Sequence, residues 1–279
     1  MSRLKTIAVN DTILHYSDAG PLSDLNGRSA PTFLFVHGAA ASCNHVAFLR
    51  DHLIRDFRVI SFSQRFHLPN HPNPSGVYGA DTHARDLVAF MEALELKNVI
   101  LLGHSYGGLV AASAAVLAPH LIKHLFLAEA TLPSLVNDNP VYQEIINIRI
   151  NAFENIKATF ESGDPALAVK TLLDYAIGGK GFNTLPEEIK KDMIANAGSL
   201  FHLVYQQAPA TIASAEALKK LTMPVTILLG EKCTPMYQAV AEELKKILPT
   251  VKQKIFAGVA HDLIFEAAED CAFEIKNAI

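Results

Sequence analysis

The residues with the clearest chemical meaning in this sequence surround Ser105, in the segment 103–107, which reads Gly-His-Ser-Tyr-Gly. An apolar run at 99–102 precedes this segment and predicts a buried strand. A run of small residues at 109–116 follows it and predicts a helix packed closely on a sheet. The chain must turn sharply between the two, and the flanking glycines leave room for that turn. A serine on such a turn presents its hydroxyl as a nucleophile; the alternative is an incidental serine in a glycine-rich turn.

A serine hydroxyl is a useful nucleophile only when a base removes its proton, and histidine is the usual base. The sequence contains 12 histidines, so only position can single one out. His261 follows a predicted strand at 252–257 and precedes the last predicted helix. We predict that His261 is the base, the alternative being a loop histidine that caps that helix.

These segments resemble the α/β-hydrolase fold family over nearly the whole chain. The segment 103–107 has the family's Gly-x-Ser-x-Gly pattern, 258–261 (Gly-Val-Ala-His) resembles its Gly-x-x-His loop, and 37–40 (His-Gly-Ala-Ala) resembles its His-Gly-x-x loop. The resemblance implies an oxyanion hole formed by the backbone N–H groups of Ala39 and Tyr106. It also gives His37 the task of orienting that loop through side-chain hydrogen bonds.

The acid that should orient His261 departs from the family pattern. The family usually places Asp at the end of a Gly-x-x-Asp turn after the seventh strand, but here 230–233 reads Gly-Glu-Lys-Cys. Some family members carry the acid after the sixth strand, where this sequence has Glu129. We therefore predict a triad of Ser105, Glu129 and His261, with the Glu129 carboxylate within hydrogen-bond reach of His261 Nδ1. The alternative makes Glu129 a surface carboxylate or an ion-pair partner.

Two polar residues follow the predicted strand at 57–62 and have two possible roles. Arg65 or His67 could contact the substrate by recognising a carboxylate or a carbonyl group. Alternatively, this segment is a structural loop in which Arg65 pairs with a carboxylate.

The elements that must position these residues alternate between strands and helices, which predicts an α/β fold with helices on both faces of a sheet. The family resemblance implies eight strands, mostly parallel, with the second antiparallel. Parallel strands place their carboxyl ends along one edge, where ligands bind. Strands are predicted at 4–9, 12–18, 32–36, 57–62, 99–102, 124–128, 225–230 and 252–257, and helices at 43–56, 80–96, 235–248 and after 261.

Residues 132–221 interrupt this alternation with helical patterns alone. Asp164-Pro165 predicts a helix start, and 184–187 (Thr-Leu-Pro-Glu) has the spacing of a capping box. Because this segment follows Glu129 directly, we predict a lid at 132–221 between two parts of the core, 1–131 and 222–279, rather than an ordinary surface insertion. Its aromatic residues suggest a mainly apolar substrate: Phe153, Phe160, Phe182, Phe201 and Tyr205.

Composition excludes several classes of protein. The chain has 279 residues, a net charge of −4 and no basic patch, which argues against nucleic acid and anionic membranes as partners. We find no apolar run long enough to span a bilayer and no signal peptide. The three cysteines are far apart and lack metal-ligand spacing, which predicts no metal site and favours a reducing, cytoplasmic location. A monomer and a homodimer both remain open.

The resemblance implies a cofactor-free serine hydrolase that cleaves an ester, a lactone or a similar small carbonyl compound through an acyl-enzyme. Fold alone does not fix the reaction. The alternatives are a non-hydrolytic enzyme of the same fold (a lyase, a carbon–carbon bond hydrolase or a cofactor-free oxygenase) and a receptor that binds a small molecule.

Overall fold

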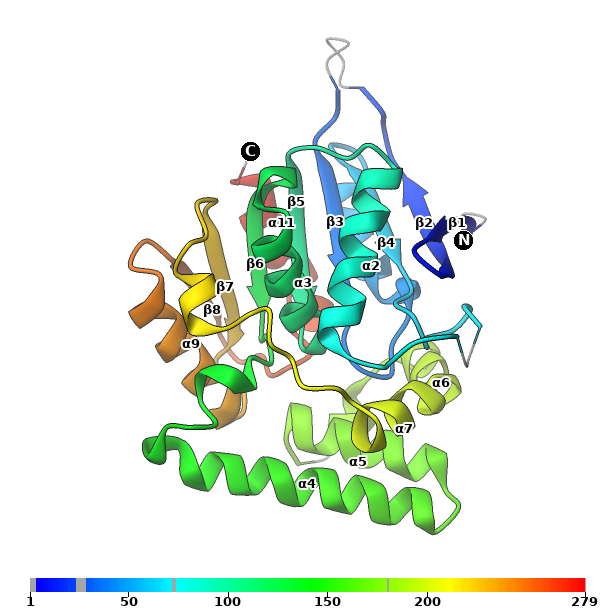
Figure 1. Ribbon diagram of the computed structural model, residues 1–279, viewed down its shortest axis with the longest axis vertical. Helices are drawn as coiled ribbons and strands as arrows, with labels where there is room; N and C mark the ends of the chain where they lie inside the picture. Colours follow the sequence, from blue (N-terminus) through cyan, green and yellow to red (C-terminus); the bar gives the residue numbers. More distant parts are fainter. Residues whose placement is uncertain (1–3, 24–28, 72–73, 180, 279) are drawn as a thin grey trace.

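The computed structural model describes residues 4–23, 29–71, 74–179 and 181–278, and its centre is one eight-stranded sheet (Figure 1). The strand order is β1-β2-β4-β3-β5-β6-β7-β8. Strand β2 is antiparallel to β1 and β4, and the other neighbouring pairs are parallel, as predicted. The strands are β1 (Lys5–Val9), β2 (Thr12–Ala19), β3 (Thr32–Val36), β4 (Arg58–Phe62), β5 (Val99–His104), β6 (Ile122–Ala128), β7 (Val225–Gly230) and β8 (Lys252–Phe256).

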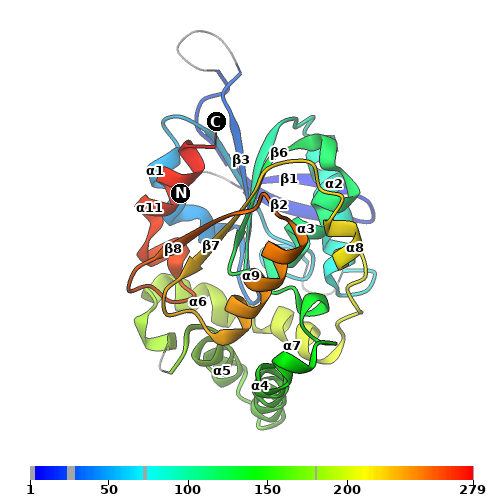
Figure 2. The ribbon, with the colours of Figure 1, turned by 90° about the vertical axis from the view of Figure 1, so that its left-hand side faces the viewer.

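Helices cover both faces of the sheet (Figure 2). One face carries α1 (Ala47–Leu53), α10 (Leu263–Glu266) and α11 (Ala268–Lys276), and the other carries α2 (Ala80–Ala93), α3 (Tyr106–Leu117), α8 (Ala215–Leu218) and α9 (Pro235–Ile247). Because side chains alternate along a strand, each central strand supplies both cores. In β3, Phe33 and Phe35 pack with α1 and α11, whereas Leu34 and Val36 pack with the opposite layer.

The predicted helical segment at 132–221 forms four further helices, α4 (Gln143–Glu161), α5 (Pro165–Ile177), α6 (Glu187–Ala195) and α7 (Ala197–Tyr205), before α8. Both views place α4–α7 beyond one end of the sheet, and α8 returns beside α3. Short 3-10 turns connect the elements: η1 (Cys43–Val46), η2 (Pro119–Leu121), η3 (Pro133–Leu135), η4 (Pro140–Tyr142) and η5 (Gly181–Thr184). Within the described residues, no helix is both long and apolar enough to cross a bilayer.

The two predicted helix starts in this segment have different outcomes. Asp164 caps α5, because its carboxylate accepts a hydrogen bond from the Leu167 N–H at 2.8 Å. The predicted capping box at 184–187 is wrong, because α6 begins at Glu187 with Pro186 as its N-cap residue. The Thr184 hydroxyl instead donates to the Gly181 carbonyl in the preceding 3-10 turn.

Several boundaries differ from the predictions by a turn or less. The helix predicted at 43–56 divides into a 3-10 turn and α1, and the helix predicted at 80–96 ends at Ala93. Glu95 and Asn98 have positive φ and cannot continue that helix. Parts of the loops at 18–31 and 69–79 lie outside the described residues.

Candidate active site

Ser105 lies on a strained turn between β5 and α3. Its backbone has φ 56° and ψ −122°, a sparsely populated region that costs about 1–3 kcal/mol for a residue other than glycine. The turn needs the glycines on both sides. A Cβ at Gly103 would lie 2.3 Å from the Gly107 carbonyl oxygen, and one at Gly107 would lie 2.3 Å from the Val36 carbonyl oxygen. The strain therefore places the Ser105 hydroxyl on the wall of a cavity at the end of the sheet.

The loop after β3 is fixed beside Ser105 by His37. The His37 Nε2 atom accepts the Gln64 backbone N–H at 3.0 Å, so Nδ1 carries the hydrogen and donates it to the Gly38 carbonyl at 2.9 Å. Burial holds the pKa of His37 well below its usual value, which keeps the ring neutral. Ala39 and Tyr106 both line the cavity next to Ser105.

The predicted contact between Glu129 and His261 is present. Glu129 Oε2 lies 2.7 Å from His261 Nδ1, and its other oxygen accepts the Gly230 N–H at 2.8 Å. Glu129 is 1% exposed, and burial raises the pKa of its carboxyl group to about 7. Burial also lowers the pKa of His261. A neutral imidazole with its hydrogen on Nδ1 has a lone pair on Nε2 that can accept a proton.

Cys233, at the family's usual position for the acid, is also buried close to this pair. Burial, and then the charge of Glu129, raise the pKa of its thiol to about 11. The thiol is therefore protonated at neutral pH and cannot replace a carboxylate.

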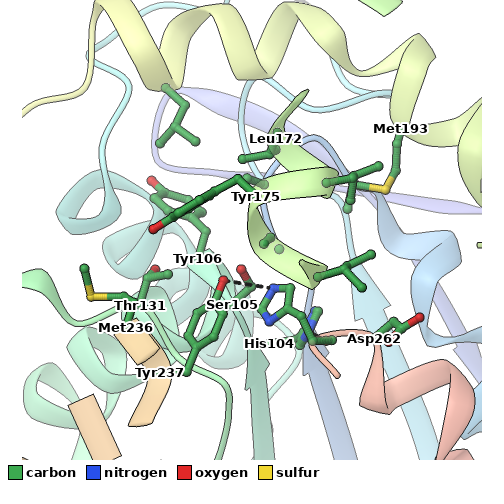
Figure 3. A pocket seen from close by; sticks show the side chains of 18 of the residues that line it. His104, Ser105, Tyr106, Thr131, Leu172, Tyr175, Met193, Met236, Tyr237 and Asp262 are labelled. Carbon is green, nitrogen blue, oxygen red and sulfur yellow. Dashed lines mark hydrogen bonds between the residues drawn. The ribbon is translucent and has the colours of Figure 1, made fainter. Parts of the chain in front are cut away.

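Tyr237, in the first turn of α9, is a site residue that the sequence analysis missed. Its ring stacks on the His261 imidazole, with centroids 4.4 Å apart and planes 5° apart. Its hydroxyl lies 3.3 Å from His261 Nε2, which is the dashed contact in Figure 3. A hydrogen bond with Ser105 lowers the pKa of this phenol, but burial and the charge of Glu129 outweigh it and keep the pKa well above its usual value. Tyr237 thus contacts both the predicted nucleophile and the predicted base.

His104 supports the loop that carries His261. Its Nε2 atom donates a hydrogen bond to the His261 carbonyl oxygen at 2.9 Å, and the two rings lie 4.7 Å apart. Burial lowers the pKa of His104 to about 3, so a second positive charge beside the base is disfavoured.

Arg65 and His67 do not line the cavity, which corrects their predicted substrate contact. Arg65 is 2% exposed, and its guanidinium is occupied by Asp86 at 2.8 Å and Asp11 at 2.6 Å. His67 is buried, and its Nδ1 donates to the Arg65 carbonyl at 3.0 Å. The structure therefore matches the alternative interpretation, a structural loop in which Arg65 is paired with carboxylates.

The cavity contains about 960 Å³ of empty space, including its mouth, and lies between the sheet edge and the helices of 132–221. Most of its lining is apolar, including Leu172, Leu173, Ile177, Leu185, Met193 and Met236. Among the aromatic residues of the segment 132–221 that suggested an apolar substrate, Phe153 lines the cavity, whereas Phe201 and Tyr205 are each 40% exposed and pack on Phe160. Phe182 contacts Lys190 away from the cavity lining.

A family model described as alpha/beta hydrolase fold matches residues 31–268. The chain belongs to the α/β-hydrolase fold family. This α/β-hydrolase is 25% identical to a non-heme chloroperoxidase of Streptomyces lividans, over 93% of each chain. It is 24% identical to the karrikin insensitive 2 receptor B of Petunia hybrida, over 80% of each chain.

Solved structures share the fold of this α/β-hydrolase at low sequence identity. Est816, described as an N-acyl homoserine lactone degrading enzyme, has a TM-score of 0.75 at 17% identity, covering 99% of this chain and 100% of its own. The carboxylesterase CesB of Bacillus subtilis has a TM-score of 0.75 at 15% identity, covering 99% of this chain and 91% of its own.

Proposed function

We propose that this α/β-hydrolase is a cofactor-free serine hydrolase that cleaves an ester, a lactone or a similar carbonyl compound through an acyl-enzyme. The observation that carries this proposal is the connected series of contacts from Glu129 through His261 and Tyr237 to Ser105. A strained serine, a neutral imidazole and a buried carboxylate at one cavity are the parts that acyl transfer needs.

The proposed reaction begins when the Ser105 oxygen attacks the substrate carbonyl carbon and its proton passes to His261 Nε2. The Glu129 carboxylate stabilises the imidazolium that forms. The backbone N–H groups of Ala39 and Tyr106 donate to the oxyanion. Collapse of the tetrahedral intermediate breaks the bond to the leaving alcohol, whose oxygen takes the proton from His261. Water then attacks the acyl-enzyme with the same proton transfers and frees Ser105.

Tyr237 gives the proton a second path in this proposal. Its hydroxyl donates to His261 Nε2 and lies within hydrogen-bond reach of Ser105. The Ser105 proton can move to the phenol oxygen while the phenol proton moves to Nε2. The phenol stays neutral throughout, in keeping with a pKa that burial raises.

The segment at 132–221 acts as a lid in this proposal. Its helices α4 and α5 supply Arg149, Phe153 and Leu172 to the wall that faces Ser105. In α6, Asp192 accepts hydrogen bonds from Ser42 at 2.9 Å and Asn44 at 3.2 Å, which ties the segment to the loop after β3. Lid closure of this kind excludes water and selects the substrate.

A fluorophosphonate probe together with a chromogenic short-chain ester tests the proposal. The probe should label Ser105, and Ser105→Ala should abolish both labelling and turnover without changing the melting temperature substantially. Ser113→Ala, at a buried serine in the adjoining helix α3, is the matched control and should retain both. Equal labelling of the Ser105→Ala protein would show that the nucleophile is wrong. Ligand-induced stabilisation with negligible ester turnover would instead favour a receptor.

A further inference from the structure

Arg149 differs from Arg58 and Arg65 because it has no carboxylate partner among the residues that the structure describes. Arg58 contacts Asp18 at 2.9 Å, and Arg65 contacts Asp86 at 2.8 Å. The half-buried Arg149 side chain lines the Ser105 cavity, with its guanidinium 4.8 Å from the centre of the Phe153 ring. Among the residues that the structure describes, we find no ion pair for it.

The surroundings of Arg149 place its charge on one side of the cavity. Burial lowers the pKa of Arg149, and the groups that act on its charge are the phenols of Tyr175 and Tyr237. Figure 3 shows these two tyrosines on the same side of Ser105, with Asp262 on the opposite side. Tyr237 bonds to His261, and Arg149, Tyr237 and Ser105 all line the same cavity.

Among the described residues, neither Asp262, which lines the cavity, nor the buried Glu129 forms an ion pair with Arg149. Asp262 lies on the opposite side of Ser105 from Tyr175 and Tyr237 in Figure 3, and burial raises the pKa of its carboxyl group to about 6. Glu129 is engaged by His261 and by the Gly230 N–H. A desolvated cation without a counter-ion is costly, and its ring contact with Phe153 compensates only in part. A ligand that brings its own anion into the cavity would remove that cost.

We propose that Arg149 binds a carboxylate of the substrate, so that the enzyme acts on esters whose acyl chain ends in a carboxylate, such as half-esters of aliphatic dicarboxylic acids. The apolar lining, with Leu172 and Leu185, contacts the methylene chain. The guanidinium fork suits a carboxylate because it can donate two parallel hydrogen bonds. This inference rests on the proposed hydrolase function and adds the substrate class.

Paired substrates test the charge separately from the size of the acyl group. Mono-4-nitrophenyl esters of glutaric, adipic and suberic acid carry the carboxylate, and their methyl-capped counterparts are neutral and of similar shape. Arg149→Met should lower the ratio of kcat/KM for the acid to that for its methyl ester about tenfold or more for the best-fitting length. Arg149→Lys should keep part of the ratio.

Lys157→Met is the matched control, because it removes the same charge from α4 at a residue that pairs with Glu154 and does not line the cavity. It should leave the ratio at the wild-type value. An unchanged ratio in Arg149→Met at all three lengths would overturn the inference. If Arg149→Met does not fold, Arg149→Gln makes the same comparison with a polar side chain.

A binding measurement separates this inference from the proposed function. Adipate and its monomethyl ester are added to the Ser105→Ala protein, with and without Arg149→Met, and the melting temperature is recorded. Stabilisation by adipate that requires Arg149, in a protein whose parent cleaves none of the esters, would refute the hydrolase but support the anion site. Turnover of the neutral esters without any Arg149-dependent preference or binding would refute the anion site and leave the hydrolase.

Discussion

Replacing Glu129 with Gln tests the least usual part of the proposed triad. The two Glu129 oxygens have separate partners, the Gly230 N–H and His261 Nδ1. In Glu129→Gln, the amide oxygen can still accept the Gly230 N–H, and the amide NH₂ then faces Nδ1. An NH₂ donor favours the tautomer with hydrogen on Nε2, which cannot accept the Ser105 proton.

The size of the loss follows from the charge that the substitution removes. The Nδ1–Oε2 distance is 2.7 Å, which puts the centres of the imidazolium and carboxylate charges about 4 Å apart. With an effective dielectric constant of about 20, their attraction is about 4 kcal/mol. If this attraction is absent in the ground state and present in the transition state, kcat/KM should fall about a thousandfold.

The assay is the pre-steady-state and steady-state cleavage of a 4-nitrophenyl ester. Glu231→Gln is the matched control, because Glu231 is exposed and its carboxylate accepts the Gly258 N–H in the neighbouring turn. That variant and Cys233→Ala should stay within a fewfold of the wild type. A loss below about tenfold in Glu129→Gln, or a larger loss in Cys233→Ala, would refute this account of the acid.

Two further predictions concern the base and its neighbour. The active state needs ionised Glu129 and neutral His261, so kcat/KM should fall as the pH decreases. Burial raises the pKa of Glu129 to about 7 and lowers that of His261, so the pair takes its proton first on the carboxylate. A pH–rate profile of kcat/KM should therefore have its midpoint near pH 7. In Glu129→Gln only His261 remains to titrate, so the midpoint of the residual activity should move below about 6.5, and an unmoved midpoint would show that the carboxylate does not take part. Tyr237→Phe keeps the ring stacked on His261 but removes the hydroxyl. This variant should have a kcat about 5–10-fold lower than the wild type, while fluorophosphonate still labels Ser105. A kcat equal to that of the wild type would exclude the phenol from the proton path.

The sequence predicted those parts of the site that depend on local pattern. The turn around Ser105 could be predicted because glycines and a strand–helix change have to occur together there. The contact of Glu129 with His261 could be predicted because the parallel strands bring their carboxyl ends to one edge. The central strands β3, β5 and β7 followed from continuous apolar runs, and the covering of both sheet faces followed from the alternation of strands and helices.

The remaining site residues depend on packing that no local pattern encodes. Arg65 follows a strand, as a binding residue would, but α2 places Asp86 against it and leaves no capacity for a ligand. Arg149 lies in a helix with an ordinary polar pattern, and only the packing of α4 places it at the cavity. Tyr237 follows the expected position for the acid by four residues, so its place in the first turn of α9 was a usable signal.

Glu129 and Cys233 lie close together, which bears on how the position of the acid could change between related enzymes. Glu129 follows β6, Cys233 follows the neighbouring strand β7, and the charge of Glu129 acts on the Cys233 thiol, so we expect that a carboxylate at either position could orient the same imidazole. A chain with a carboxylate at both positions, 129 and 233, would have two candidate acids. It could lose either one and still orient its catalytic base. On this proposal we expect the acid to be able to move from one strand to the other through variants that remain active.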